Sequence, residues 1–286
     1  ANTDPYAEVQ LSAGSFNSYR ASGEVNTGVM DNNFAFYSRY SRIYSDGYRD
    51  HSGTNANSFF FSGGYFGEKD LVKFTAFTGR TQNDLAYGVI PESVLEEDPT
   101  VNFLDENDID DFGQYMAQLQ YTRKFNDEFS LINTLYAGGS GGDFPFGFYN
   151  EDSSMLTQIN YPLYNRHYGY ILNGLYNRNN LEIAGGFHIY TFGRENLEQV
   201  VPNYANPYYD ETSRKDEIAG FAKANYEFGR LNLFADLQIR STTLDIFPDY
   251  SFMDTVDLGS ISRDWLFVNP KVGLSLEINP SFTGYA

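Results

Sequence analysis

Hydrophobic and polar side chains alternate along many segments of this chain, with a period of two residues. The clearest example places Leu231, Leu233, Ala235, Leu237 and Ile239 on one side and Asn232, Asp236, Gln238 and Arg240 on the other. Similar segments set Tyr115, Ala117, Leu119 and Tyr121 against Gln114, Gln118, Gln120 and Thr122, and Leu181, Ile183, Gly185, Phe187 and Ile189 against Glu182 and His188. A period of two predicts β-strands with one apolar and one polar face.

The connections between these segments are short at one end and long at the other. The short ones contain Gly, Asn, Asp or Pro, which tight turns favour; they are 31–33, 67–70, 126–128, 179–180, 229–230 and 279–281. The long ones are polar and acidic; they are roughly 45–56, 82–112, 141–165, 194–214 and 247–263. Strands of soluble sandwiches are mostly about 5–6 residues long, whereas these segments have about ten or more, a length that suits tilted strands crossing a bilayer.

We therefore expect an all-β fold, an antiparallel transmembrane β-barrel. About twelve strands are expected here, with another beginning at Thr283, short periplasmic turns and long extracellular loops. A barrel is the form that pairs every backbone group of a sheet within hydrocarbon. The expected localisation is the outer membrane of a Gram-negative cell, as a multi-pass barrel. A soluble β-sandwich or a repetitive adhesin is the alternative.

Composition narrows the functional classes. Aromatic residues make up 17% of the chain, with 25 Phe, 24 Tyr and a single Trp, which suits strands. No apolar run approaches the roughly 18 residues that a membrane helix needs. With no cysteine there is no disulfide framework. The net charge of −19 argues against nucleic acid as a partner, because phosphate binding needs a basic face.

Five stretches in order along the chain carry a family resemblance. They are VQLSAGSFNSYRASGEVNTG (9–28), YSRIYSDGYRDHSGTNANSFFFSGGYFG (40–67), YGVIPESVLEEDPTVNFLDENDIDDFGQYMAQLQYTRKF (87–125), NRHYGYILNGLYNRNNLEIAGGFHIYTFGREN (165–196) and DWLFVNPKVGLSLEINPSFTGYA (264–286). Together they resemble hairpins from the N-terminal half of the β-barrel of TonB-dependent outer-membrane receptors, especially the iron-siderophore type.

This resemblance implies that residues 1–286 are a partial receptor barrel, from a family barrel of about 22 strands. The plug domain, the TonB-contacting segment (TonB box) and the C-terminal strands of the family are expected to lie outside this chain. The implied function is uptake of a scarce nutrient, with a ferric siderophore or another metal chelate as the expected ligand. The implied partners are the TonB complex through the plug, the lipid bilayer and, as an open alternative, a surface lipoprotein. A passive channel, or a structural barrel within a larger assembly, is the competing function.

Catalysis and metal binding find little support in the sequence. The three histidines, His51, His167 and His188, have no evident serine partner, so we expect neither an enzyme nor a catalytic residue. The segment from Asp105 to Asp108 begins like a calcium loop but lacks its glycine, and Ile109 occupies a ligand position. No metal site and no cofactor are therefore predicted.

Ligand contact is expected at aromatic and basic residues in or beside the long loops. The candidates are Tyr48, Arg49, His51, Phe144, Phe146, Tyr149, Tyr164, Arg166, Tyr204 and Tyr208. The first three belong to RIYSDGYRDHS (42–52), which gathers charge, aromatic rings and a histidine around Gly47. Because Asp46-Gly47 supplies turn chemistry, this segment is predicted to be the first long surface loop.

Overall fold

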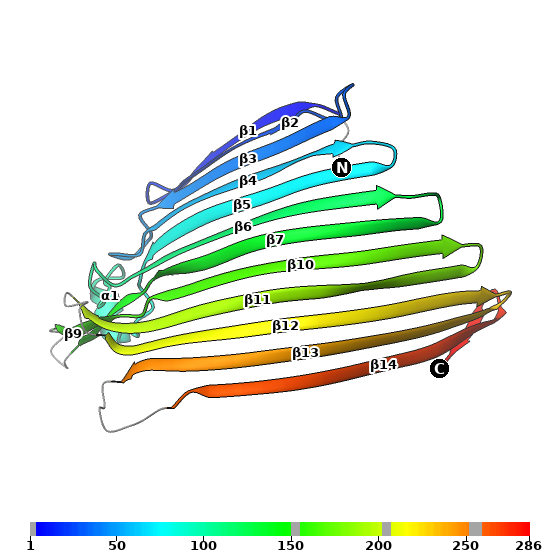
Figure 1. The fold of residues 1–286 in the computed structure, drawn as a ribbon. Coiled ribbons are helices and arrows are strands. Elements are labelled where there is room, and N and C mark those ends of the chain that lie inside the picture. The colour runs from blue at the N-terminus through cyan, green and yellow to red at the C-terminus, as the bar shows by residue number, and fades with distance from the viewer. Residues whose placement is uncertain (1–3, 150–154, 202–206, 252–258) are drawn as a thin grey trace.

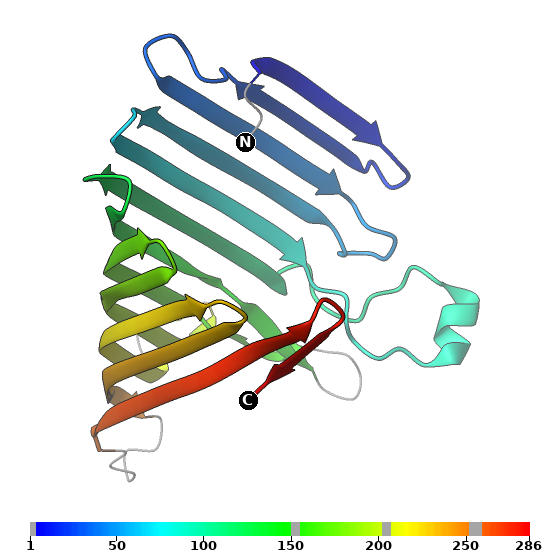
Figure 2. The same ribbon diagram turned by 90° about the vertical axis from the view of Figure 1, so that its right-hand side faces the viewer.

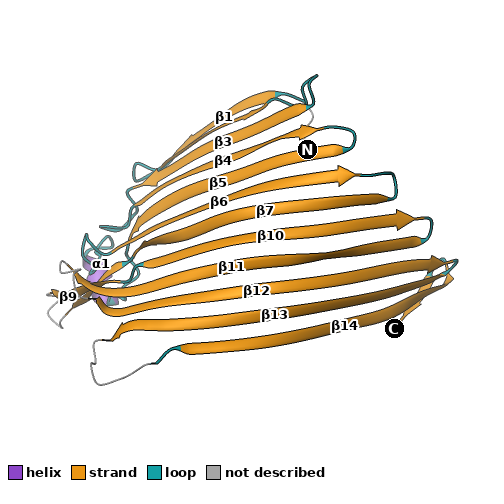
Figure 3. Cartoon of the chain, in the orientation of Figure 1, coloured by secondary structure: helices purple, strands orange, loops and turns teal. Residues whose placement is uncertain are grey.

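The structure is a computed structural model that describes residues 4–149, 155–201, 207–251 and 259–286. It contains one 15-stranded antiparallel sheet and a single short helix, α1 (Figure 3). The elements are β1 (Tyr6–Ala13), β2 (Tyr19–Asn26), β3 (Phe34–Ser45), β4 (Thr54–Phe66), β5 (Asp70–Asp84), α1 (Glu92–Glu97), β6 (Ile109–Lys124), β7 (Phe129–Asp143), β8 (Pro145–Tyr149), β9 (Met155–Asn160), β10 (Leu163–Arg178), β11 (Leu181–Val201), β12 (Pro207–Phe228), β13 (Leu231–Ser251), β14 (Ile261–Asn279) and β15 (Phe282–Tyr285).

The strands follow one another in an up-and-down order. Along the sheet, β1 to β7 are followed by β10 to β15, and the short hairpin β8–β9 attaches to β11 through β9. The final strand begins at Phe282, one residue before the predicted start. The sheet curves strongly, and its first and last strands form separate edges (Figure 2). The expected antiparallel, barrel-type all-β fold is confirmed.

The six short connections predicted above lie at one end of the sheet, and α1, β8 and β9 lie at the other, here called the loop end (Figure 1). The six predicted turns are confirmed, since each falls at the boundary between two paired strands. Asn179 and Gly229 have positive φ angles of 50° and 61° in the two tightest turns. Asn and Gly tolerate this left-handed conformation, which explains their presence there.

At the loop end the strands extend further than the sequence predicted. Most of the described residues within the expected loops 141–165, 194–214 and 247–263 are in strands, whereas 46–53 and 85–108 are true connections. The prediction is wrong there because polar, acidic composition does not by itself indicate a loop. A sheet ladder is made of backbone hydrogen bonds, so polar strands continue to pair once they have left an apolar environment.

The two faces of the sheet differ in chemistry, as predicted. On the long strands, the buried side chains of Ser22, Thr134, Glu217, Ala219 and Thr242 lie on the predominantly polar face, as their cross-strand pairing shows. Crowding of side chains identifies this face as the concave one. The opposite, convex face exposes a continuous band of large apolar side chains; examples are Val9, Phe59, Leu135, Ile189, Ile218, Leu237 and Val272.

The concave wall carries an ordered polar cluster in its middle. Tyr136 Oη lies 2.7 Å from His188 Nε2, and the imidazole stacks on Tyr190 with ring centroids 5.0 Å apart. The Tyr136 ring covers Gly169, where an added Cβ would come within 2.2 Å of it. His188 therefore lies on the polar face, as the alternation predicted. Within the described residues, no helix is long and apolar enough to cross a membrane.

Candidate functional site

Three chain segments form a connected layer at the loop end. This loop layer comprises residues 46–53, residues 85–108 and the β8–β9 hairpin. The amide of Asn102 joins the first two segments, since its Nδ2 donates to the carbonyl oxygens of Asp50 at 2.8 Å and Leu85 at 2.9 Å. The backbone N–H of Asp50 also donates to the carbonyl of Thr100 at 2.8 Å.

Asp108 joins the second segment to the hairpin, and its side chain is 0% exposed. Its Oδ1 accepts hydrogen bonds from the Gly147 N–H at 2.7 Å and from Gln158 Nε2 at 3.0 Å. Its Oδ2 accepts from the Asp105 N–H at 3.1 Å. Because a buried carboxylate is costly unless it is hydrogen-bonded, these donors make Asp108 a strong anchor for the layer.

Aromatic rings reinforce the same junction. Phe146 stacks on Tyr87, with ring centroids 5.8 Å apart, and Phe144 lies 6.2 Å from Phe112. Partial desolvation, with a smaller effect from the charge of Asp108, raises the pKa of the Tyr87 hydroxyl, although much of its side chain is exposed. Phe144 and Phe146 are thus partly engaged in packing within the protein. Ligand contact by either ring stays a prediction.

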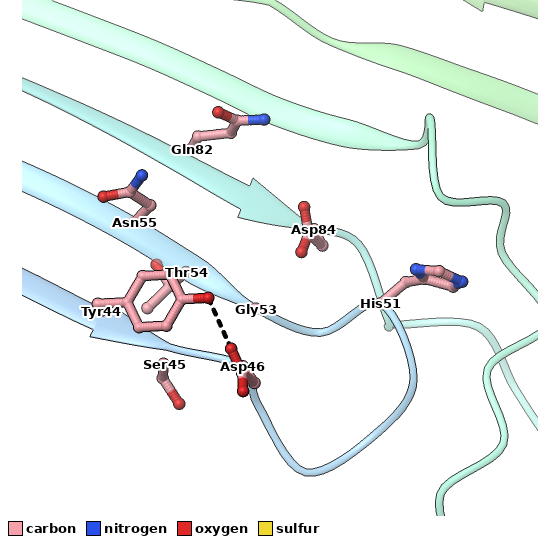
Figure 4. A pocket seen from close by; sticks show the side chains of 9 residues that line it. All are labelled: Tyr44, Ser45, Asp46, His51, Gly53, Thr54, Asn55, Gln82 and Asp84. Carbon is pink, nitrogen blue, oxygen red and sulfur yellow. Dashed lines mark hydrogen bonds between the residues drawn. The ribbon is translucent and has the colours of Figure 1, made fainter. Parts of the chain in front are cut away.

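A polar pocket of about 310 Å³ lies beside this layer (Figure 4). Its lining consists of Tyr44, Ser45, Asp46, His51, Gly53, Thr54, Asn55, Gln82 and Asp84. Asp46 accepts a hydrogen bond from Tyr44 Oη at 2.6 Å and another from Asn17 Nδ2. These two hydrogen bonds hold the pKa of the Asp46 carboxyl below its usual value, and the bond from Tyr44 has the larger effect.

Carboxylate and amide oxygens dominate this lining, so the pocket can accept hydrogen bonds from hydroxyl or ammonium groups. It lies toward the convex side of the sheet edge, since Tyr44, Asn55 and Gln82 are cross-strand neighbours on the convex face. Among the described residues, no three His, Cys, Asp or Glu side chains are grouped so that they could hold a metal ion.

The three predicted residues of the first loop have different surroundings. Tyr48 is 53% exposed and meets the Phe16 ring edge-on at 5.5 Å. Arg49 instead fixes the layer, because its Nη1 donates to the Ala86 carbonyl at 2.8 Å. His51 adopts a positive φ of 48° and lines the polar pocket. Tyr48 and His51 therefore keep side-chain surface that a ligand could reach.

The other predicted residues are not gathered with this group. Tyr164 and Arg166 belong to β10 and lie on the convex face, where the Tyr164 ring covers Gly141. Tyr149 and Tyr208 lie within β8 and β12, and their side chains fall outside the described part of the structure. Tyr204 lies outside the described residues altogether.

Several residues that organise the loop end were not predicted. Contacts with other segments of the loop end involve Asn102, Tyr87 and Asp84, and local sequence does not reveal such contacts. Asp108 stood out only as part of an acidic run, and the one available signal was its place within Asp105–Asp108. Its role depends on the β8–β9 hairpin, which donates two hydrogen bonds to its carboxylate.

The sequence matches no family model and no curated protein. Its fold, in contrast, is similar to that of solved import receptors. For the ferric-catecholate import receptor Fiu from E. coli K12, the TM-score is 0.79 at 12% identity over 99% of this chain and 54% of that one. For the ferric yersiniabactin uptake receptor FyuA from Yersinia pestis, the TM-score is 0.72 at 12% identity, and the match covers 99% of this chain and 46% of that one. For the copper transporter OprC, the TM-score is 0.72 at 13% identity, and the match covers 99% of this chain and 44% of that one. The chain thus spans about half the length of these structures and has the fold of their barrel portion.

Proposed function

We propose that this chain is the barrel portion of a TonB-dependent outer-membrane receptor that imports a ferric siderophore or another metal chelate. The observation that carries the proposal is the fold, which follows receptors for ferric chelates and copper over 99% of the chain. Identity of 11–13% to such structures leaves the individual ligand open. In this proposal, the loop layer captures the ligand and a plug domain, acted on by TonB, controls its passage.

The convex face supports a membrane location. On β14, the outward-facing positions from Leu266 to Leu276 carry no charged side chain, since Lys271 pairs with Asp236 on the concave face. That segment is about 33 Å long at ~3.3 Å per residue. With a strand tilt of about 40°, it covers a height of about 25 Å, which equals the apolar band of outer-membrane barrels.

The concave face supports a hydrated interior. It carries lysine, arginine and glutamate side chains, among them Arg39, Lys215 and Glu217. Charged residues of this kind are costly in contact with hydrocarbon and are normal in a barrel lumen. The loop layer, whose three segments are joined by the hydrogen bonds of Asn102 and Asp108, gives the proposed receptor a preformed surface at its outer mouth.

Uptake measurements test the proposal. Cells that carry or lack the gene are supplied with radioactive ferric catecholate, ferric citrate and a copper chelate under metal limitation. At least one chelate should accumulate only with the gene, and a protonophore or loss of TonB should abolish accumulation, because tight capture requires energy for release.

A steady open pore would contradict active import. Planar-bilayer conductance of the purified full-length protein measures this directly, and the proposal expects closed-state currents. Uptake that proceeds equally with and without TonB, together with steady conductance, would favour the passive channel. A protein recovered only in soluble fractions would contradict both.

A further inference from the structure

A pair of arginines lies on the convex face just beyond the apolar band. Arg166 on β10 and Arg214 on β12 are both cross-strand partners of Gly193 on β11. All three therefore share one row and one face, with the glycine between the arginines. Two strand spacings separate the arginine Cα atoms by about 9.6 Å.

Gly193 leaves the space between the two arginines open. A Cβ atom built at this position would meet only the Ser213 carbonyl oxygen, at 4.0 Å. The row thus contains a notch with a guanidinium group on each side and backbone as its floor. Arginine binds phosphate oxygens with paired, charge-assisted hydrogen bonds, so a notch of this width suits a phosphate group.

An apolar groove of about 610 Å³ lies directly below the notch on the same face. Its outward-facing lining includes Leu135, Tyr168, Ile189 and Ile218, and Arg214 stands at its upper end. These four side chains are between 43% and 59% exposed. A hydrocarbon chain would cover this surface and gain the free energy of apolar burial.

The height of the notch matches the position of lipid headgroups. Tyr168 shares a row with Thr191 and Asp216, where the apolar band gives way to polar residues. The arginine row lies two residues further, about 5 Å higher for a strand tilted by about 40°. Because a row tilts with its strands, the two arginine Cα atoms lie about 3 Å below and above that of Gly193. The headgroup region is about 5–7 Å thick on each side of the hydrocarbon, and both long side chains can reach it with their guanidinium groups.

Three acids lie near the notch on the same face: Asp216, Asp245 and Glu195, which lies one row beyond Gly193 and is paired across the strands with Tyr164 and Thr212. Asp216 Oδ2 lies 2.8 Å from Arg214 Nε, which orients this guanidinium and leaves its terminal nitrogens available. Asp245, the cross-strand partner of Arg214, accepts a hydrogen bond from Ser262 Oγ at 2.6 Å. Within the described part of the chain, the exposed Arg166 side chain has no hydrogen-bonding or ionic partner.

We propose that Arg166, Gly193 and Arg214 form a binding site for the phosphate of a membrane lipid, whose acyl chain lies in the groove below. The site rests on the proposed membrane location but is independent of the imported ligand. It faces the bilayer rather than the lumen, and it assigns Arg166 to lipid binding rather than to nutrient capture.

Lipid titration of the purified, delipidated full-length protein tests the site. Native mass spectrometry measures binding of short-chain phosphatidic acid, with the matching diacylglycerol and inorganic phosphate as comparison probes. The intact protein should bind phosphatidic acid preferentially. The double variant Arg166→Gln/Arg214→Gln should bind it about thirtyfold more weakly, which is the loss of about 2 kcal/mol expected for two basic residues near a membrane surface.

Two further variants test whether lipid binding needs the shape of the notch or only positive charge on the convex face. Gly193→Leu keeps both arginines but fills the space between them, and it should weaken phosphatidic acid binding as well. Arg42→Gln removes another arginine of the convex face, whose side chain contacts Asn55, and it should leave binding unchanged.

Equal binding by the intact protein and the double variant would overturn the site. So would equal loss in Arg42→Gln, or displacement of phosphatidic acid by an equal concentration of inorganic phosphate. Retained uptake and membrane location with no phosphate-selective lipid binding would refute this inference alone. A protein that does not enter the membrane would refute both it and the proposed function.

Discussion

Replacement of Asp108 is expected to release the loop layer without unfolding the sheet. The carboxylate is fully buried and accepts from two N–H groups and one amide of neighbouring segments. Hydrogen bonds to a charged group contribute about 1.5–3 kcal/mol each, so loss of two should favour local opening by about 3 kcal/mol or more. Since 1.4 kcal/mol corresponds to about tenfold, amide exchange in the layer should accelerate about a hundredfold.

Hydrogen–deuterium exchange read by mass spectrometry measures this effect. In Asp108→Ala, peptides from 85–108 and 145–149 should exchange faster, while peptides from β12 and β13 keep their protection. Asp108→Asn should have a smaller effect, because the remaining amide oxygen can still accept the bonds made by Oδ1. Glu97→Gln on the exposed face of α1 is the matched control and should change nothing.

Unchanged exchange in Asp108→Ala would refute the anchoring role. An equal rise across the whole sheet would refute the claim that the loop layer opens as a local unit.

Two other predictions test the faces and the polar pocket. Leu237→Arg places a charge at the middle of the apolar band and should lower the free energy of unfolding by about 2–4 kcal/mol, measured by urea unfolding in lipid vesicles. Gln238→Arg, on the concave face, should leave the free energy of unfolding nearly unchanged. Equal losses in the two variants would contradict the assignment of these residues to opposite faces. Tyr44→Phe should raise the Asp46 pKa toward its ordinary value of 3.8, measured by carboxyl NMR titration, because the tyrosine hydrogen bond is the main cause of the lowered pKa. The pKa of Asp46 is lowered in the folded state, so its charged carboxylate stabilises the fold at neutral pH. This stabilisation is lost at acidic pH, as the pH falls below 3.8 and through the lowered folded-state pKa. An unshifted Asp46 pKa in Tyr44→Phe would contradict the hydrogen bond.

The strands and their facing could be predicted from the sequence because both depend on local patterns. The alternation from Leu231 to Arg240 fixes which residues face outward, and turn residues such as Asn179 and Gly229 mark where the chain reverses. The pattern fails where β11, β12 and β13 continue as polar strands. There, backbone pairing with a neighbour decides the structure, and the side-chain pattern gives no signal.

The loop end could be predicted only in part, because its contacts join segments far apart in the chain. The chemistry of Arg49 and Phe146 predicts ligand contact, yet each has a partner that no local pattern indicates, the Ala86 carbonyl and the Tyr87 ring. The sequence predicts Arg166 in or beside a loop, whereas strand register places it beside Gly193 on the convex face. Pairing between strands, rather than residue type, therefore determines which ligand each candidate can meet.

The central claim, that the convex face meets lipid and the concave face lines a hydrated lumen, can be tested residue by residue. Because the chain has no cysteine, single cysteines can be introduced from 231 to 241 and spin-labelled in outer-membrane preparations. Collision rates with oxygen, which concentrates in lipid, and with a water-soluble nickel complex are then compared. The account predicts high oxygen collision at Leu233, Leu237 and Ile239 and high nickel collision at Asp236 and Gln238. Rates that do not alternate, or that alternate in the opposite sense, would contradict it.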